Sequence, residues 1–155
     1  MSHSLCRSLF HIVFGTKQRR DYIPKSSLEN TWAYIAGIAR NHDMRVFAVG
    51  GTQNHIHALV ELSPELAPAA AVRTLKCNSS RWLRESVPLF QWQQGYGAFS
   101  VSPSQLGRVV NYISHQAQHH ARYSFEEEFR SILKAAGINR RFDDYCVAPE
   151  GAPGR

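Results

Sequence analysis

The sequence predicts an α+β fold of the ferredoxin-like type, a split β-α-β arrangement whose antiparallel sheet has helices on one face, with further helices at the C-terminal end. Segments rich in β-branched and aromatic residues alternate with segments of helical apolar spacing, in the order strand, helix, strand, strand, helix, strand. The chain has 155 residues, of which 43% are hydrophobic. One domain with a single core is therefore expected.

The first strand and the first helix follow from composition and capping. Residues 4–14 (SLCRSLFHIVF) are rich in β-branched and aromatic side chains and indicate a strand, and residues 15–20 indicate a basic loop. Ser26 and Ser27 are candidate N-caps of a helix that runs to about Asn41. The apolar stripe of this helix consists of Leu28, Trp32, Ile35 and Ile38.

The next segment predicts a β-hairpin. Residues 44–49 indicate the second strand, and residues 55–62 indicate the third. Between them, Gly50 and Gly51 predict a tight turn or a bulge.

A second helix and a short fourth strand complete the predicted sheet. Pro68 suits the first turn of a helix that extends to about Glu85, and Pro88 ends this segment. Residues 98–101 indicate the fourth strand.

The C-terminal part is predicted to be helical. A third helix is expected at about residues 104–121. Ser124 is a candidate N-cap of a fourth helix at about residues 125–136, which has glutamates near its positive end. We expect one domain over residues 1–147 and a flexible tail over residues 148–155, which is rich in proline and glycine.

Charge and cysteine content narrow the class of protein. The formal net charge of +6 favours a polyanionic partner such as nucleic acid, although many basic proteins have none. The three cysteines form no CxxC pair, so we expect reduced thiols rather than a disulfide framework or a zinc ribbon. The sequence has no predicted membrane span or signal peptide, and we expect a bacterial cytoplasmic, nucleoid-associated protein.

The most informative feature is the pair His55 and His57 on the third predicted strand. Side chains alternate between the two faces of a strand, so both imidazoles point to the same side. Two neutral imidazoles on one face can bind a divalent metal ion. The alternative is that one histidine belongs to the core and the other to the surface.

Tyr112 and Gln116 supply the second half of a possible site. Their i, i+4 spacing places them on one face of the third predicted helix. A tyrosine can act as a covalent nucleophile, and the glutamine carbonyl can serve as a third metal ligand. Otherwise Tyr112 is a half-buried helix residue and Gln116 is a solvated one.

Five segments together resemble the single-tyrosine HUH transposases of the smallest insertion sequences, including the tyrosine transposases associated with repeated extragenic palindromes (REP). They are residues 10–17 (FHIVFGTK), 54–60 (NHIHALV), 75–83 (LKCNSSRWL), 92–101 (WQQGYGAFSV) and 111–116 (NYISHQ). Gln53 and Asn54 depart from the family pattern, which often has Pro-Asp before the first histidine.

The resemblance implies a role for each matching residue. His55, His57 and Gln116 would bind Mg²⁺ or Mn²⁺, and Tyr112 would attack the scissile phosphate of single-stranded DNA with hairpin ends. The products would be a 5′-phosphotyrosine and a free 3′-OH. The family works as homodimers in which the tyrosine helix can lie in cis or in trans. No nucleotide cofactor is expected, and no Walker-type glycine loop is present in the sequence.

Further candidates surround this core set. Basic and aromatic side chains that could bind DNA phosphates or stack on bases are Lys17, Arg19, Arg20, Lys76, Arg81, Arg84 and Trp92. His115, His119 and His120 could replace Gln116 as a ligand or contact phosphate, or simply form a polar helix face.

Two other functions stay open at this point. One is a domesticated, non-catalytic nucleic-acid-binding module of the same fold. The other is an RNA-binding ferredoxin-like domain, which would need exposed aromatic residues on its central strands. Phe47 gives that interpretation little support.

Overall fold

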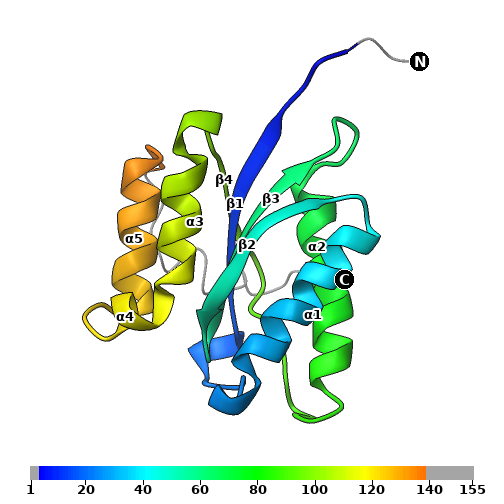
Figure 1. The fold of residues 1–155 in the computed structure, drawn as a ribbon. Helices are drawn as coiled ribbons and strands as arrows, with labels where there is room; N and C mark the ends of the chain where they lie inside the picture. Colours follow the sequence, from blue (N-terminus) through cyan, green and yellow to red (C-terminus); the bar gives the residue numbers. More distant parts are fainter. Residues whose placement is uncertain (1–3, 139–155) are drawn as a thin grey trace, which may run out of the picture.

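The computed structural model describes residues 4–138 and contains one four-stranded sheet (Figure 1). Its strands are β1 (Ser8–Gly15), β2 (Arg45–Thr52), β3 (His55–Leu62) and β4 (Gly97–Ser100). Their order is β2-β3-β1-β4, and every neighbouring pair is antiparallel. The predicted ferredoxin-like α+β fold is therefore confirmed.

Helices lie on both sides of this sheet (Figure 1). On one side are α1 (Leu28–Asn41) and α2 (Pro68–Leu83). On the other side lie α3 (Leu106–Ser114), α4 (Gln116–His120) and α5 (Phe125–Ala135). Short 3-10 helices occur at Lys17–Arg19, Lys25–Ser27 and Pro103–Gln105. Within residues 4–138, no helix is long and apolar enough to cross a membrane.

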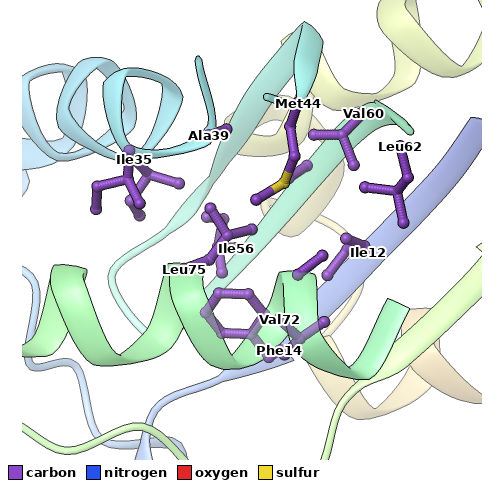
Figure 2. Close-up of a cluster of buried hydrophobic side chains, with 13 residues drawn as sticks. Ile12, Phe14, Ile35, Ala39, Met44, Ile56, Val60, Leu62, Val72 and Leu75 are labelled. Carbon is purple, nitrogen blue, oxygen red and sulfur yellow. The ribbon is translucent and has the colours of Figure 1, made fainter. Parts of the chain in front are cut away.

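The main hydrophobic core lies between the sheet and the helices α1 and α2 (Figure 2). Strand β3 contributes alternate residues to it, among them Ile56 and Val60, and β1 contributes Ile12 and Phe14. These side chains are all 0% exposed. The alternation places the intervening residues of β3, including the two histidines, on the opposite face.

That opposite face carries a smaller apolar cluster and the polar site. Phe125 and Phe129 of α5 pack against Val13 of β1, with Phe99 at the edge of the cluster. The Ser124 side chain accepts a hydrogen bond from the backbone N–H of Glu127, which confirms the predicted N-cap of this helix. Helix α5 is thus fixed to the sheet at its first two turns.

The hairpin turn lies further along the chain than predicted. Strand β2 continues through Gly50 and Gly51 to Thr52, and both glycines pair in register with β3. The prediction of a tight turn or a bulge at the two glycines was therefore wrong, and the register shift of this pair lies between Val46 and Ala48. A Cβ atom at Gly50 would lie 2.6 Å from the backbone oxygen of Ile113 in α3, which explains why a glycine is needed there. The glycine allows α3 to approach the sheet closely.

The helix predicted at residues 104–121 is interrupted. It is divided into α3 and α4 by His115, whose φ of −110° and ψ of 25° are not helical. The expected boundaries of the domain, at 1–147, and of the tail, at 148–155, reach outside the described residues and stay predictions.

Candidate active site

The two histidines of β3 lie side by side beneath the helices α3 to α5. His55 and His57 are both 0% exposed and face away from the main core. Their ring centroids are 5.2 Å apart. The prediction that both imidazoles share one face of the strand is confirmed, and the alternative of one core histidine and one surface histidine is wrong, because both are buried.

A glutamate from α5 meets both imidazoles. Oε1 of Glu128 lies 2.7 Å from Nε2 of His57 and 3.5 Å from Nε2 of His55. Oε1 of Gln116 lies 3.2 Å from the same Nε2 atom of His55. The structure thus brings Gln116 to the histidines as expected, and adds Glu128, which the sequence did not single out.

The Nδ1 atom of each histidine also has a hydrogen-bond partner. Nδ1 of His55 is 2.8 Å from Oδ1 of Asn54 and 2.9 Å from Oγ1 of Thr52. Nδ1 of His57 is 2.8 Å from Nε2 of His11 on β1. Because Oδ1 of Asn54 only accepts, Nδ1–H of His55 donates and Nε2 of His55 keeps the lone pair that a metal ion would use. Nε2–H of His57 donates to Oε1 of Glu128 in this structure, so metal binding through that nitrogen would require the other tautomer, in which Nδ1–H donates to His11.

Burial keeps the imidazoles of His11 and His55 neutral. Burial, followed by the proximity of His57, lowers the pKa of His11 to about 3. The same two causes hold the pKa of His55 well below its usual range. A neutral imidazole is the form that binds metal, because protonation would occupy the lone pair.

The phenol of Tyr112 reaches the same carboxylate from α3. Its hydroxyl donates a hydrogen bond to Oε2 of Glu128. Burial, and then this bond, raise the pKa of the Tyr112 phenol above its usual value. Burial alone would also raise the pKa of Glu128, but hydrogen bonds from His120 and His57 outweigh it and hold that pKa below its usual range. Tyr112 is therefore a protonated phenol that donates its hydrogen bond to an ionised Glu128 carboxylate.

Tyr112 and Gln116 meet at the site by a different route from the one predicted. They do not share a face of one continuous helix, because the helix breaks at His115 between them. Instead, Tyr112 contacts Glu128 from α3, and Gln116 begins α4 and turns toward His55.

The three histidines after Tyr112 take different positions. Nε2 of His120 lies 3.1 Å from both Oε1 of Gln116 and Oε2 of Glu128, so His120 belongs to the site. His119 approaches the same Oε2 atom at 3.3 Å but is partly exposed. His115 is exposed, and its Nδ1 lies 2.7 Å from the backbone oxygen of Asn111.

This donor set fits a divalent metal ion. One ligand atom from each of His55, His57, His120 and Glu128 lies within 4.8 Å of the other three. Imidazole nitrogens and carboxylate oxygens suit transition metals, and the oxygens also suit Mg²⁺. The Nε2 atom of Gln116 is buried without a hydrogen-bond partner in the described part of the chain, so the structure does not fully satisfy this side chain as it stands.

Two clefts open on Tyr112 from solvent. One, of about 500 Å³, is lined by Tyr112, His119, Tyr123 and residues of α5 that include Glu128. The other, of about 840 Å³, shares the first three residues and also has Arg108 and Arg122 in its wall. Sequence reasoning missed both arginines, although Arg108 lies one helical turn before Tyr112.

The basic residues predicted to bind DNA divide between two regions. Lys17 and Arg20 are exposed in the turn after β1, where Arg19 forms an ion pair with Glu126 of α5. Arg81 is exposed on α2 and Arg84 is exposed directly after its end, and α2 lies across the sheet from α3 and Tyr112 (Figure 1). DNA binding by any of them stays a prediction.

Lys76 and Trp92 have structural partners. The Lys76 ammonium donates to the backbone oxygens of Gln93 and Gly95, and burial lowers its pKa to about 8. The Trp92 indole donates to Oγ of Ser79, and its ring meets Phe14 and Phe90 edge to face. Both side chains therefore hold the loop before β4 against α2.

Comparison with known proteins now defines the family. The model of the family "Transposase IS200 like" matches residues 4–116, which include His55, His57, Tyr112 and Gln116. This chain belongs to that family. The IS200-like transposases are transposition enzymes that cut DNA, and the family match ends before Glu128.

Similar proteins agree with this assignment. The chain is 23% identical over 126 residues to the transposases for insertion sequence element IS200 of Salmonella typhimurium and Salmonella typhi, an alignment that covers 76% of this chain and 82% of each relative. These proteins are similar to this IS200-like transposase along most of its length. They support the family and its role in DNA transposition.

Two solved structures have the same fold. A putative transposase from Deinococcus radiodurans has a TM-score of 0.61 and 18% identity, and the match covers 75% of this chain and 95% of that chain. A REP-associated tyrosine transposase bound to a REP hairpin has a TM-score of 0.58 and 13% identity, covering 100% of this chain and 99% of that one. The resemblance predicted from sequence motifs is confirmed.

Sequence reasoning missed Glu128 because it lies outside the motifs. Its neighbours Glu126 and Glu127 suggest an exposed acidic first turn. A signal was nevertheless present, since Phe125, Glu128 and Phe129 share one helix face by their i, i+3 and i+4 spacing. An acidic residue between two aromatic residues on an otherwise apolar face indicates a buried carboxylate with a specific partner.

Proposed function

We propose that this IS200-like transposase is a metal-dependent, single-strand-specific DNA endonuclease and strand transferase in which Tyr112 is the nucleophile. One observation carries the proposal. The Tyr112 hydroxyl and the Nε2 atoms of His55 and His57 all approach the carboxylate of Glu128 within one chain. A nucleophile and a metal site so placed can act on the same phosphate.

The chemistry is a transesterification. The Tyr112 oxygen attacks the scissile phosphorus, its bond to phosphorus forms, and the bond from phosphorus to the 3′ oxygen breaks. The leaving oxygen gains a proton and becomes a free 3′-OH, while the 5′ side stays attached as a phosphotyrosine. The phenol must give up its proton in this step, and the Glu128 carboxylate is the acceptor to which it is already hydrogen-bonded.

A divalent ion, Mg²⁺ or Mn²⁺, would be held by His55, His57 and Gln116. Such an ion neutralises charge on a phosphate oxygen when it is bound. The chain's own contribution is to hold these ligands in place, through Asn54 and Thr52 for His55 and through His11 for His57. No nucleotide cofactor is needed, because the phosphotyrosine conserves the energy of the phosphodiester bond.

The proposed substrate is single-stranded DNA with hairpin ends. The REP-associated transposase that shares this fold is bound to a REP hairpin, which supports the choice. The cleft lined by Arg108 and Arg122 leads to Tyr112 and offers positive charge for a phosphate backbone. Such a role places the chain with chromosomal DNA in the bacterial cytoplasm.

The homodimer implied by the resemblance stays a prediction. The contact of Tyr112 with Glu128 of its own chain supports a cis placement of the tyrosine helix. The choice between cis and trans stays a prediction.

The test is formation of a covalent protein–DNA adduct. Purified protein is mixed with labelled hairpin-bearing single-stranded DNA and Mg²⁺ or Mn²⁺, and the products are separated under denaturing conditions. We expect an adduct with wild type, and none after EDTA treatment or in Tyr112→Phe. An adduct that persists in Tyr112→Phe would contradict the proposed nucleophile.

The same assay tests the non-catalytic alternative. A domesticated binding module of this fold would bind the hairpin DNA, form no adduct, and be indifferent to EDTA and to Tyr112→Phe. The RNA-binding alternative finds no support in the described residues, because helices cover both faces of the central strands β1 and β3 (Figure 1).

A further inference from the structure

We propose that Glu128 is a carboxylate ligand of the metal ion and, through its second oxygen, positions the nucleophile Tyr112. This inference rests on the proposed metal-dependent function and adds a residue outside the segment that the family matches, residues 4–116. Helix α5 would then be an integral part of the active site.

The two oxygens of Glu128 face two different sets of groups. Oε1 lies 2.7 Å from Nε2 of His57 and 3.5 Å from Nε2 of His55, the atoms that would bind the metal. Oε2 accepts the hydrogen bond from the Tyr112 hydroxyl. One carboxylate can therefore bind the ion on one side while it holds the phenol on the other.

The environment of Glu128 calls for a compensating positive charge. The residue is 3% exposed, and the groups that meet its carboxylate include imidazoles and a phenol rather than bulk water. Burying a carboxylate is costly unless it is paired or binds a metal. A divalent cation between Oε1 and the two Nε2 atoms would supply that charge.

The fold holds Glu128 in this position from both sides. Phe125 stacks on the ring of His55 with centroids 4.3 Å apart. Phe129, on the same helix face, packs with Val13 and Phe125. The N-cap Ser124 fixes the start of the helix. These contacts fix the position of Glu128 before any metal ion binds.

Direct metal binding tests the assignment. Mn²⁺ binding to the full chain is measured by calorimetry without DNA, for wild type, Glu128→Gln and Glu127→Gln. Glu127 is a matched control because it is exposed on the same helix. We expect Glu128→Gln to weaken Mn²⁺ binding at least about 10-fold and Glu127→Gln to leave it unchanged. Wild-type affinity in Glu128→Gln would overturn the inference.

A second measurement covers the possibility that Glu128→Gln does not fold, which circular dichroism would show. Glu128→Asp keeps the charge but shortens the side chain, and Co²⁺ serves as a spectroscopic substitute. We expect the Co²⁺ visible spectrum to change in Glu128→Asp and to stay the same in Glu127→Asp. An unchanged spectrum in both would contradict Glu128 as a ligand.

The outcomes separate this inference from the proposed function. A wild-type chain that binds neither Mn²⁺ nor Co²⁺ would contradict metal dependence itself, and the inference with it. Wild-type binding combined with unaffected Glu128 variants would overturn only the role of Glu128. The role of the second oxygen toward Tyr112, which combines positioning with proton acceptance, has its own readout, since Glu128→Gln should lower the rate of adduct formation even at saturating Mn²⁺.

Discussion

The two faces of strand β3 show how one segment can serve packing and chemistry at once. On one face, Ile56 and Val60 join the apolar core beneath α1 and α2 (Figure 2). On the other, His55 and His57 meet polar groups from α4 and α5. All four side chains are 0% exposed. Burial alone therefore does not distinguish the structural face from the proposed catalytic one.

The difference lies in what each face requires of its neighbours. Apolar side chains need hydrophobic neighbours of about the right size, and several residue types meet that requirement. Buried imidazoles and carboxylates need partners of a particular kind at a particular distance. On the second face those partners come from separate elements, namely His11, Gln116 and Glu128. Its function thus depends on how the C-terminal helices dock.

The strongest test of the comparison substitutes neighbouring residues of β3. His57→Ala should lower adduct formation by at least about 100-fold, because it removes a proposed metal ligand. Ile56→Ala should instead lower the free energy of unfolding by about 2–5 kcal/mol through the cavity it leaves. Adduct assays and denaturant unfolding measure the two effects. Equal activity loss per folded molecule in both variants would remove the functional distinction between the faces.

A second test shifts α3 relative to the sheet without substituting a proposed catalytic residue. In Gly50→Ala the new Cβ would meet the backbone oxygen of Ile113 at 2.6 Å, so α3 must shift. We expect a loss of about 1–3 kcal/mol in stability and a slower adduct step, because Tyr112 precedes Ile113. Gly107→Ala in the same helix has nothing within 4 Å of its Cβ and serves as the control. A normal adduct rate in Gly50→Ala would show that Tyr112 tolerates the shift.

The smallest effect concerns the basic residues on either side of the sheet. Arg108 lines the cleft at Tyr112, whereas Arg81 lies on α2. Arg108→Ala should weaken binding of hairpin DNA several-fold and lower the salt dependence of the binding constant by about one unit of slope. Arg81→Ala should have a smaller effect. A larger effect of Arg81→Ala, measured by salt titration of binding, would place the DNA on the α1 and α2 side.

The sequence predicted the fold well because its signals are local. Alternation along residues 55–62 and helical spacing in residues 28–41 each reflect a repeating backbone geometry, and both elements are present as predicted. The turn between β2 and β3 was misplaced because glycines usually mark turns. Gly50 is needed instead for the close approach of α3, a contact that involves Ile113 far along the chain.

The candidate site was only partly predictable for the same reason. His55, His57, Tyr112 and Gln116 were found through motifs, and the structure brings them together. The break at His115 was not predicted, because residues 104–121 have no proline or glycine near that position. DNA binding by Lys76 and Trp92 stays a prediction, and their partners Gln93 and Ser79 could not be inferred from the sequence because only the folded chain brings them near.

The sequence by itself determined that His55 and His57 share one face of a strand, because side-chain alternation is a property of the extended backbone. It also determined the family, since five motifs occur in order. Only the tertiary structure decided which groups those histidines meet. Glu128 lies 71 positions after His57 and reaches it through the docking of α5 on the sheet, a contact that no local pattern encodes.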